Sequence, residues 1–441
     1  MSFEMKAVVI GAGLAGSESA YFLAEHGVKV TLIEMKPQKK TPAHKNDLFG
    51  ELVCSNSLKS EDELTASGLL KKELEILDCF LLKCAISSRV PAGGALAVDR
   101  EIFAKTITDK LKTHPNITII QKEQEDLDFS CPVILATGPL TDGKIKEALG
   151  KIIGNNNLFF YDAIAPIVES SSVDMDFAFW GNRYDKGGEA GDYINCPMNK
   201  EEFNNFYTEL IKAKTVPLKE FEELKVFEGC MPVEQIALRG FQCLRFGPMK
   251  PVGLFYEKEN RMPWAAVQLR KENTQGTTFN LVGFQTNLTF GEQKRIFSMI
   301  PALKNAEFVR YGVMHRNSYL NAPLSLTHFS SLKNSPNIFV AGQLSGVEGY
   351  MESIASGLFC AINVLKTLQE KPLFVPSSKT CFGALFNEIS SEVKKNFQPV
   401  NANYGIMNMP DNKFPSKNEK RKKILEESLF EINVYKENIE K

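Results

Sequence analysis

The sequence has no pair of cysteines at CxxC spacing and no cluster of cysteine and histidine at the spacing of metal ligands. Its nine cysteines are scattered, and an odd number argues against a complete disulfide framework. We therefore expect a protein of a reducing cytoplasm, with no structural zinc and no other metal site.

Long apolar runs and an excess of charge are also absent. No stretch approaches the ~18 apolar residues that span a bilayer, and the N-terminus has no signal-peptide layout. Lys and Arg total 52 against 53 Asp and Glu, so any RNA-binding surface must be local. The 441 residues, 43% of them hydrophobic, have room for two or three domains with sizeable cores. We predict a globular cytoplasmic protein with no membrane partner and leave its oligomeric state open.

A glycine-rich turn near the N-terminus has the layout of a dinucleotide-binding site. An apolar strand at 7–10 precedes the sequence GAGLAG at 11–16, and a helix then runs to Gly27. A second strand follows and ends in Glu34. This βαβ order predicts a site for FAD or NAD, although an S-adenosylmethionine fold can also end its second strand in an acid.

Each glycine of this turn has its own task. Gly11 makes the tight turn, Gly13 lets backbone amides reach a pyrophosphate, and Gly16 permits close packing of the helix on the strand. Glu34 stands where an acid accepts hydrogen bonds from a ribose diol. The residues of the turn that we expect to contact the cofactor are Gly11, Ala12, Gly13, Leu14, Ala15 and Gly16.

Two later segments favour FAD. The stretch 131–140 is a buried strand that ends in Ala-Thr-Gly, and the stretch 337–365 is another strand followed by a glycine-rich turn and a helix. In two-domain flavoproteins such a late strand and helix N-terminus return to the first domain and hold the FAD diphosphate, ribityl chain and flavin. No second GxGxxG stands between them, so NAD(P)H is expected to visit the flavin transiently. The further FAD contacts predicted here are Thr137, Gly138, Gly342 and Gln343.

The first third of the chain supplies further helices and strands. We expect one amphipathic helix over 60–84 with Ser60 as its cap, in which Cys79 and Cys84 serve packing. A glycine-rich turn then leads to Asp99, which caps another helix, and a strand follows at 116–123. Alternation of strand and helix predicts a parallel sheet.

A change of character from about Asp174 to Arg316 indicates a second domain. Aromatic, Asn- and Gly-rich segments alternate there with strands, as in a mixed α+β domain inserted into the first. The predicted fold class is α/β: a Rossmann-like FAD-binding domain, of the two-dinucleotide-fold flavoprotein type, with an inserted α+β domain. The predicted segments are 1–173 and 321–410 for the FAD-binding domain, 174–320 for the inserted substrate or RNA-binding domain, and 411–441 for a C-terminal amphipathic tail.

The inserted region is locally basic. Between Arg239 and Arg316 there are twelve Lys or Arg, five Glu and no Asp, an excess of seven positive charges, with Phe, Tyr and Trp interleaved. Such a surface could contact phosphates and stack bases. A solvated face whose aromatic residues belong to the core accounts for the same pattern equally well.

One thiol has an unusual setting. Cys230 follows a glycine and lies between Glu228 and Glu234, on a predicted turn rather than in a core element. A glycine lets other groups approach closely, whereas a cysteine buried as a small hydrophobe has apolar neighbours. The context hints at chemistry without defining it.

A series of short stretches, in order along the chain, carries a family likeness. They are the Gly-rich start, TPAHKNDLFGELVCSNSL, VPAGGALAVDR, FYDAIAPIVE, RYDKGG, FEGCMPVE, LRFGPMKPVGL, VQLR, GFQTN, FVRYGVMHRN and GVEGYMES. Together they resemble the folate- and FAD-dependent tRNA (uracil-5-)-methyltransferase family, TrmFO, which is related to the GidA-type tRNA modification flavoproteins. The likeness runs from about Lys6 to beyond Phe397.

The resemblance implies an RNA-modifying enzyme. The methylene carbon of 5,10-methylenetetrahydrofolate is placed on C5 of a uridine, and reduced flavin, recharged by NAD(P)H, delivers the electrons that make it a methyl group. Uracil C5 is a poor nucleophile until a thiolate adds at C6, and a base must later remove the C5 proton. The two functional cysteines of the family match Cys54 and Cys230. We assign Cys230 as the nucleophile and Cys54 as the base or second thiol, and the reverse assignment stays open.

Further site residues follow from the same resemblance. Tyr350 could stack on the pterin ring of the folate, facing the flavin. Arg245, Lys250 and Arg316 are candidates for pairing with the folate glutamate or an RNA phosphate, because guanidinium forks in particular match such anions.

The RNA target has more than one interpretation. The leading one is a uridine in the T-loop of tRNA. Phe241, Gln242, Cys243 and Asn287 depart from the family pattern within the insert, which would permit a uridine of large-subunit ribosomal RNA instead. Alternatives of other classes are a flavin oxidoreductase of a small molecule and an RNA-binding partner without catalysis.

Overall fold

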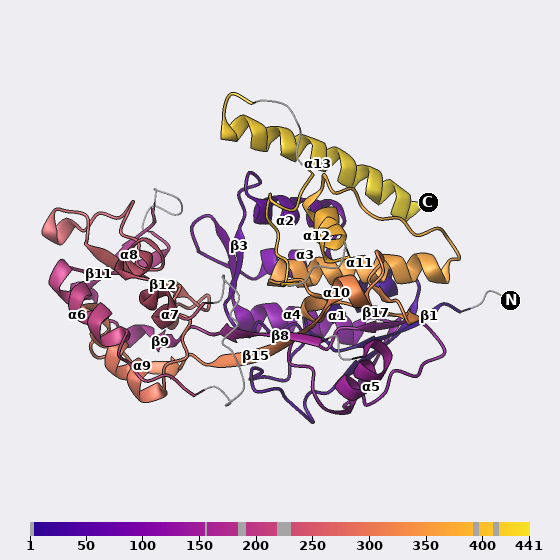
Figure 1. The fold of residues 1–441 in the computed structure, drawn as a ribbon, viewed down its shortest axis with the longest axis horizontal. Helices are drawn as coiled ribbons and strands as arrows, with labels where there is room; N and C mark the ends of the chain where they lie inside the picture. Colours follow the sequence, from indigo (N-terminus) through magenta and orange to yellow (C-terminus); the bar gives the residue numbers. More distant parts are fainter. Residues whose placement is uncertain (1–3, 155–156, 184–190, 218–230, 391–396, 409–413) are drawn as a thin grey trace.

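The computed structural model describes residues 4–154, 157–183, 191–217, 231–390, 397–408 and 414–441. Two six-stranded sheets organise these residues, one in each half of the molecule (Figure 1). An antiparallel pair of strands, β8 (Asn157–Ala163) and β15 (Met314–Leu320), runs between the halves. The predicted α/β fold with a parallel sheet is confirmed.

The sheet of the first half is built around the N-terminal strand. In spatial order its strands are β16 (Ser331–Leu332), β17 (Ser335–Val340), β7 (Val133–Leu135), β1 (Lys6–Ile10), β2 (Lys29–Glu34) and β6 (Ile117–Gln121). All neighbours pair in parallel except β16, which closes one edge in antiparallel fashion. The two segments that favoured FAD therefore lie on one side of β1, and the βαβ unit lies on the other.

Helices pack around this sheet. They are α1 (Leu14–Glu25), α2 (Ala66–Ile76), α3 (Phe80–Ser87), α4 (Arg100–Thr113), α5 (Gly143–Ile153), α10 (Ala322–Ser325), α11 (Tyr350–Leu368) and α12 (Cys381–Ile389). α1 and α11 approach closely because residue 357 is glycine: a Cβ there would lie 2.2 Å from the carbonyl oxygen of Ala15. The hydroxyl of Ser19 also donates to the carbonyl of Gly357 at 2.8 Å. The N-terminal and late parts of the chain thus form one core.

α11 corrects one expectation about apolar runs. It is long and apolar enough to cross a membrane by length and composition, but 83% of the window concerned is buried inside the protein. Since α11 packs on α1, α2 and α12, it is a core helix of this half.

The segment 60–84 differs from the prediction of a single helix. Ser60 ends a strand, β3 (Ser57–Ser60), and α2 and α3 are separated at Asp78, which has a φ of +65°. The cap of α2 is Thr65, whose side chain accepts the amide of Gly68. The apolar residues keep helical spacing through 60–84, but the backbone forms the end of a strand and then two separate helices.

A buried carboxylate explains where α3 begins. Glu18 on α1 accepts the amide of Phe80 at 3.0 Å and that of Leu81 at 2.7 Å, and so satisfies the first turn of α3. Burial raises the pKa of Glu18 to about 7, and these amides oppose the rise. Because the partners lie 62 residues apart, the local sequence could not reveal this helix start.

Other predictions for this half are confirmed. Asp99 accepts the amides of Glu101 and Ile102 at the start of α4, and β6 forms where a strand was expected. Cys79 and Cys84 are buried, and burial raises the pKa of both thiols, that of Cys84 to about 12. Both therefore serve packing. A small sheet joins β3, β5 (Ala95–Val98) and β4 (Arg89–Val90).

The second half contains the other sheet, whose neighbours pair in antiparallel fashion. Its strands, in spatial order, are β10 (Phe179–Gly181), β11 (Tyr193–Met198), β12 (Ala265–Lys271), β13 (Thr278–Leu281), β9 (Ile167–Glu169) and β14 (Phe308–Arg310). Its helices are α6 (Lys200–Leu210), α7 (Val233–Leu238), α8 (Phe241–Phe246) and α9 (Phe290–Phe297). β9 belongs to this sheet although it precedes residue 174. The division at 173/174, 320/321 and 410/411 stays a prediction.

Alternation along β12 gives this sheet two different faces. Val267 and Leu269 join the apolar core that the helices of this half complete. Gln268 and Arg270 alternate with them and are also buried, although they are polar. Arg270 reaches residues of the first half, so the two halves meet through polar contacts.

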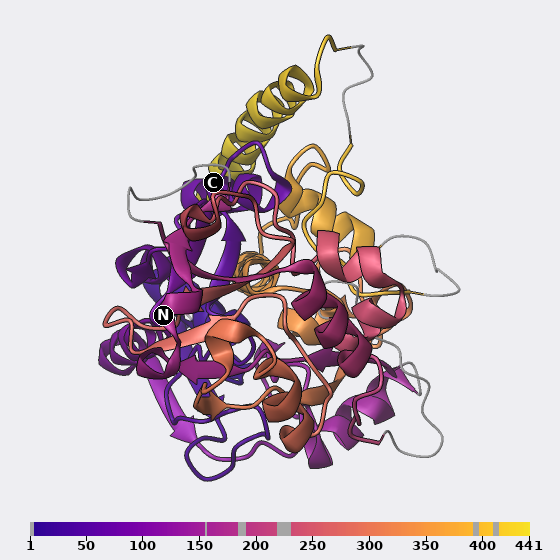
Figure 2. The same ribbon diagram turned by 90° about the vertical axis from the view of Figure 1, so that its left-hand side faces the viewer.

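A long helix, α13 (Lys417–Glu440), lies on α2 and contacts α12 through the rings of Tyr435 and Phe382 (Figure 1). Figure 2 shows its first turns reaching beyond the body of the molecule. Beneath it, the buried carboxylate of Glu73 accepts the amides of Cys381 and Phe382 and the hydroxyl of Ser428. A single carboxylate therefore joins α2, α12 and α13.

Candidate active site

A cleft opens at the carboxyl ends of β1, β2, β7 and β17, at the point where the strand order reverses. Open α/β sheets bind their ligands there. The cleft encloses about 1220 Å³ of space free of protein atoms, its open mouth included, which suits a large cofactor. Ten of the residues predicted from the sequence line it: Gly11, Gly13, Leu14, Ala15, Glu34, Thr137, Gly138, Gly342, Gln343 and Tyr350.

The glycine-rich turn has the geometry that its spacing predicts. A Cβ at Gly11, whose φ is +97°, would lie 2.5 Å from the carbonyl oxygen of Ala136. A Cβ at Gly16 would lie 1.8 Å from the carbonyl oxygen of Gly11. At Gly13, in contrast, a Cβ would meet nothing within 4 Å. Gly11 and Gly16 are thus required by packing, and Gly13 leaves open space on the cleft side.

The first turn of α1 adds a site for negative charge. α1 begins at Leu14, and its N-cap residue is Gly13, which has no side chain that could cap the first amides of the helix. Amides at the start of a helix carry partial positive charge and bind phosphate groups. A dinucleotide diphosphate therefore fits at this turn.

Glu34 fixes the same turn from the end of β2. Its buried carboxylate accepts the amide of Ala12 at 2.7 Å and that of Lys36 at 3.0 Å. Ala12 itself is buried and is not among the residues that line the cleft. Its amide contributes to the shape of the turn through this hydrogen bond. Glu34 lines the cleft as well, so its contact with a ribose diol stays a prediction that the geometry permits.

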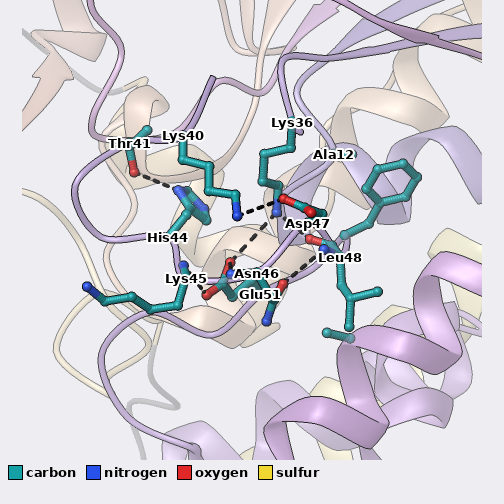
Figure 3. A network of polar contacts seen from close by, with 12 residues as sticks. Ala12, Lys36, Lys40, Thr41, His44, Lys45, Asn46, Asp47, Leu48 and Glu51 are labelled. Atoms are coloured by element: carbon teal, nitrogen blue, oxygen red, sulfur yellow. Dashed lines mark hydrogen bonds and ion pairs between the residues drawn. The ribbon is translucent and has the colours of Figure 1, made fainter. Parts of the chain in front are cut away.

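Residues of a polar loop between β2 and Cys54 line another side of the cleft. Figure 3 shows the polar contacts within this loop. The ammonium group of Lys36 is buried against the carbonyl of Leu48 and lies 3.8 Å from the carboxylate of Glu51. Burial lowers the pKa of Lys36, and neighbouring carboxylates oppose this change. The hydroxyl oxygen of Thr41 lies 2.6 Å from Nδ1 of His44, and both residues line the cleft. Sequence reasoning missed all of these residues, although Thr41, His44 and Glu51 lie in a stretch that carried the family likeness.

Cys54 lies at the edge of the cleft. The residue before it, Val53, lines the cleft, and Cys54 is half-buried. The hydroxyl oxygen of Tyr350 accepts the amide of Cys54 at 2.7 Å and that of Ser55 at 3.1 Å. Burial raises the pKa of Tyr350 well above its ordinary value, and the neighbouring Cys54 adds to the rise. Tyr350 thus has a structural contact with the segment Leu52–Asn56, which carries the thiol of Cys54 and is called the thiol segment below. Its stacking on a pterin ring stays a prediction.

Arg100 holds the same segment from α4. Its guanidinium donates to the carbonyl of Leu52 at 2.8 Å and to that of Cys54 at 3.0 Å. Its Nε lies 2.6 Å from the carboxylate of Glu272. Burial lowers the pKa of Arg100, but Glu272, Tyr350 and Cys54 together outweigh burial, and the net shift is upward. The sequence offered no local signal for this role, because Arg100 reads as the first residue of a capped helix.

The remaining predicted residues are not brought to the cleft by the described contacts. Cys230 lies outside the described residues, as does the side chain of Arg316 in β15. Arg245 lies in the second half, where its guanidinium stacks 4.0 Å from the ring centroid of Trp264 and its Nε donates to the carbonyl of Trp264. The carbonyl of Lys250 accepts a hydrogen bond from Arg183 at 2.6 Å. Their contacts with folate or RNA stay predictions.

Comparison with known proteins shows which family this chain belongs to. Residues 6–372 match the family model of glucose inhibited division protein A. The chain is 51% identical over 426 residues to methylenetetrahydrofolate--tRNA-(uracil-5-)-methyltransferase TrmFO of Fusobacterium nucleatum, covering 97% of this chain and 98% of that one. The TrmFO protein of Natranaerobius thermophilus is 51% identical over 431 residues, covering 96% and 99%. This chain belongs to the TrmFO family.

A solved structure supports the fold of this TrmFO family member. Aquifex aeolicus GidA, in its form II crystal, superposes with a TM-score of 0.72 at 14% identity, covering 99% of this chain and 73% of that chain. The form I crystal of the same protein gives a TM-score of 0.68. The GidA fold is thus shared, and the TrmFO relatives cover nearly the whole length.

Proposed function

We propose that this chain is a flavoprotein that transfers the one-carbon unit of methylenetetrahydrofolate to C5 of a uridine in tRNA. The observation that carries this function is about 50% identity, over nearly the whole length, to several proteins of that name. Their names specify tRNA, which favours tRNA over ribosomal RNA and methyl transfer over oxidation of a small molecule. A uridine of the T-loop is the proposed target, and the cytoplasm is the proposed compartment.

FAD fits the cleft on the evidence of the chain's own residues. The open side of Gly13 and the first turn of α1 would hold the diphosphate, and the carboxylate of Glu34 would hold a ribose. Thr137, Gly138, Gly342 and Gln343, which line the same cleft, would contact the remainder. When bound, FAD supplies the electrons that convert the transferred carbon into a methyl group. NAD(P)H is the proposed source of those electrons.

The thiols have the roles that activate uracil. Cys230 is the proposed nucleophile at C6, which makes C5 electron-rich, and Cys54 is the proposed base that accepts the C5 proton. Cys54 stands at the edge of the cleft, where Arg100 and Tyr350 fix its backbone. Both guanidinium charge and a fixed backbone favour a reactive thiolate at this place.

One assay tests this function. Purified full-length protein is incubated with FAD, methylenetetrahydrofolate, NADPH and a tRNA transcript, and 5-methyluridine is measured by mass spectrometry of the digested RNA. We expect methylation by the unchanged protein and at least about a 100-fold lower rate for Cys54→Ala and Cys230→Ala. Cys243→Ala is the matched control, because Cys243 is exposed on α8, and it should retain full activity.

The assay also separates the alternatives. Methylation of a ribosomal RNA transcript but not of tRNA would overturn the tRNA assignment. Full activity in both cysteine variants would remove the thiol mechanism. NADPH oxidation that is independent of RNA and folate would indicate a small-molecule oxidoreductase.

A further inference from the structure

The segment Leu52–Asn56, which carries Cys54, is held by side chains instead of by a helix or strand ladder over most of its length. Arg100 donates to the carbonyls of Leu52 and Cys54, as described above. The carbonyl between them, that of Val53, accepts from the guanidinium of Arg310 at 2.9 Å. Three successive carbonyls are therefore bound by two arginines from different halves of the molecule.

The second half holds the following two residues as well. Arg270 on β12 donates to the hydroxyl of Ser55 and to the side-chain carbonyl of Asn56, both at 2.8 Å. The Asn56 amide donates in return to the carbonyl of Lys271 at 2.8 Å. The position of Cys54 therefore depends on contacts with β12 and β14.

Burial of the charged guanidinium of Arg310 costs free energy. Among the described residues it makes one hydrogen bond, to the carbonyl of Val53, and no ion pair. Burial lowers the pKa of Arg310, and Arg100 lowers it further by repulsion. A neutral donor would satisfy one carbonyl without this cost. The charge therefore needs another explanation than the hydrogen bond.

Cys54 provides that explanation. The charged or titratable groups that act on Arg310 are Arg100 from α4, Cys54, Tyr350 from α11 and Glu272 from the second half. Arg270 adds a third guanidinium to the same segment, and Glu272 is the one carboxylate among these groups. Among the groups that the structure describes, positive charge is thus in excess around the segment that carries the thiol. Neighbouring Arg favours the thiolate form of cysteine.

We propose that Arg310 is a positioning residue for the reaction: it fixes the Cys54 segment from the second half and supplies positive charge that favours the Cys54 thiolate. The inference rests on the proposed function for the use of the thiol, but the ionisation and placement of Cys54 can be measured without any methylation. Arg310 acts through Cys54, and no contact with folate or RNA is implied.

The test compares Arg310→Met with Arg310→Lys in the full-length protein. Alkylation by iodoacetamide is followed at the Cys54 peptide by mass spectrometry, over a pH series that brackets the ordinary thiol pKa of about 8.5. In Arg310→Met we expect the pH midpoint of Cys54 alkylation to rise by about one unit. Arg310→Lys, which keeps the charge, should return the midpoint toward that of the unchanged protein. The plateau rate at high pH reports accessibility separately.

A control variant and a replacement variant accompany the alkylation test. Arg295→Met removes an exposed arginine of the same half, paired with Glu209 and Glu292, and should leave the midpoint unchanged. Arg310→Gln replaces Arg310→Met if thermal melting shows the latter to be unfolded. An unchanged midpoint in the folded neutral variant overturns the proposal. A raised midpoint in a protein that methylates no tRNA would support the role of Arg310 and reject the proposed function instead.

Discussion

The hydroxyl oxygen of Tyr350 lies 2.7 Å from the backbone nitrogen of Cys54 and accepts a hydrogen bond from it, although 296 residues separate the two in the sequence. The same oxygen accepts the amide of Ser55. Tyr350 is the first residue of α11, the helix that packs on α1 beside the glycine-rich turn. The thiol segment is therefore attached directly to the helix that closes the cofactor cleft.

Replacing this tyrosine tests the attachment. In Tyr350→Phe the amides of Cys54 and Ser55 lose their acceptor, and we expect about 1–3 kcal/mol lower free energy of unfolding in urea. We also expect at least a tenfold loss in single-turnover methylation, because the thiol segment loses its fixed position. Tyr319→Phe, which loses the hydrogen bond of a buried hydroxyl to Phe397, is the control: its stability should fall and its methylation rate should not. Equal methylation rates in the two variants would contradict a role for Tyr350 at the thiol.

The two kinds of glycine in the nucleotide turn should respond differently to alanine. Gly16→Ala places a Cβ 1.8 Å from the carbonyl of Gly11, so we expect a disrupted turn and a lower melting temperature without cofactor. Gly13→Ala places its Cβ in open space, so the protein without cofactor should keep its stability. Because that space is where the diphosphate fits, Gly13→Ala should still lose bound FAD, measured by absorbance near 450 nm per mole of protein. Full flavin content in Gly13→Ala would place the diphosphate elsewhere.

Glu34 should contribute to cofactor affinity through the turn and through the ribose. Glu34→Gln leaves one carbonyl oxygen where two carboxylate oxygens now accept the amides of Ala12 and Lys36. We expect FAD to bind about 10- to 100-fold more weakly, measured by fluorescence titration of the protein stripped of cofactor. Glu123→Gln, an exposed carboxylate at the mouth of the same cleft, should change the affinity by less than about threefold. Similar losses in both variants would argue against a specific role for Glu34.

Stability should fall as pH rises through the range set by Glu73. Burial raises the pKa of Glu73 to about 7, so the folded protein retains a proton that the unfolded chain releases near the ordinary carboxyl pKa. This stabilising contribution is complete below about pH 4 and is lost between about pH 4 and pH 7. Glu73→Gln should flatten the dependence by an amount on the order of 2–3 kcal/mol, measured as urea unfolding at several pH values. Glu75→Gln, on the exposed side of α2, should leave the slope unchanged.

The nucleotide turn was predictable because all of its determinants are local. Gly11, Gly13, Gly16 and Glu34 have fixed spacing within one βαβ unit, and the structure places each of them as that spacing requires. The late segment around Gly342 was recognised by the same logic of a strand followed by glycine and a helix.

Long-range contacts account for what the sequence could not reveal. The division of 60–84 into α2 and α3 depends on Glu18, which caps α3 from another helix. Arg100, Arg270 and Arg310 come from three elements, and each reads locally as an ordinary helix or strand residue. Their convergence on the segment Leu52–Asn56 is a property of how the two halves pack, which no spacing rule encodes. The role of Cys230 stays a prediction.

The order of strands in the first sheet bears on how the protein is synthesised. β1 leaves the ribosome well before β17 and the first turn of α11, which emerge more than three hundred residues later. The sheet of the second half lies wholly between them, so it can fold first. A nascent chain therefore cannot complete its cofactor cleft until translation has passed Tyr350, and until β17 has been synthesised the apolar strand β7 lacks its neighbour on the side away from β1.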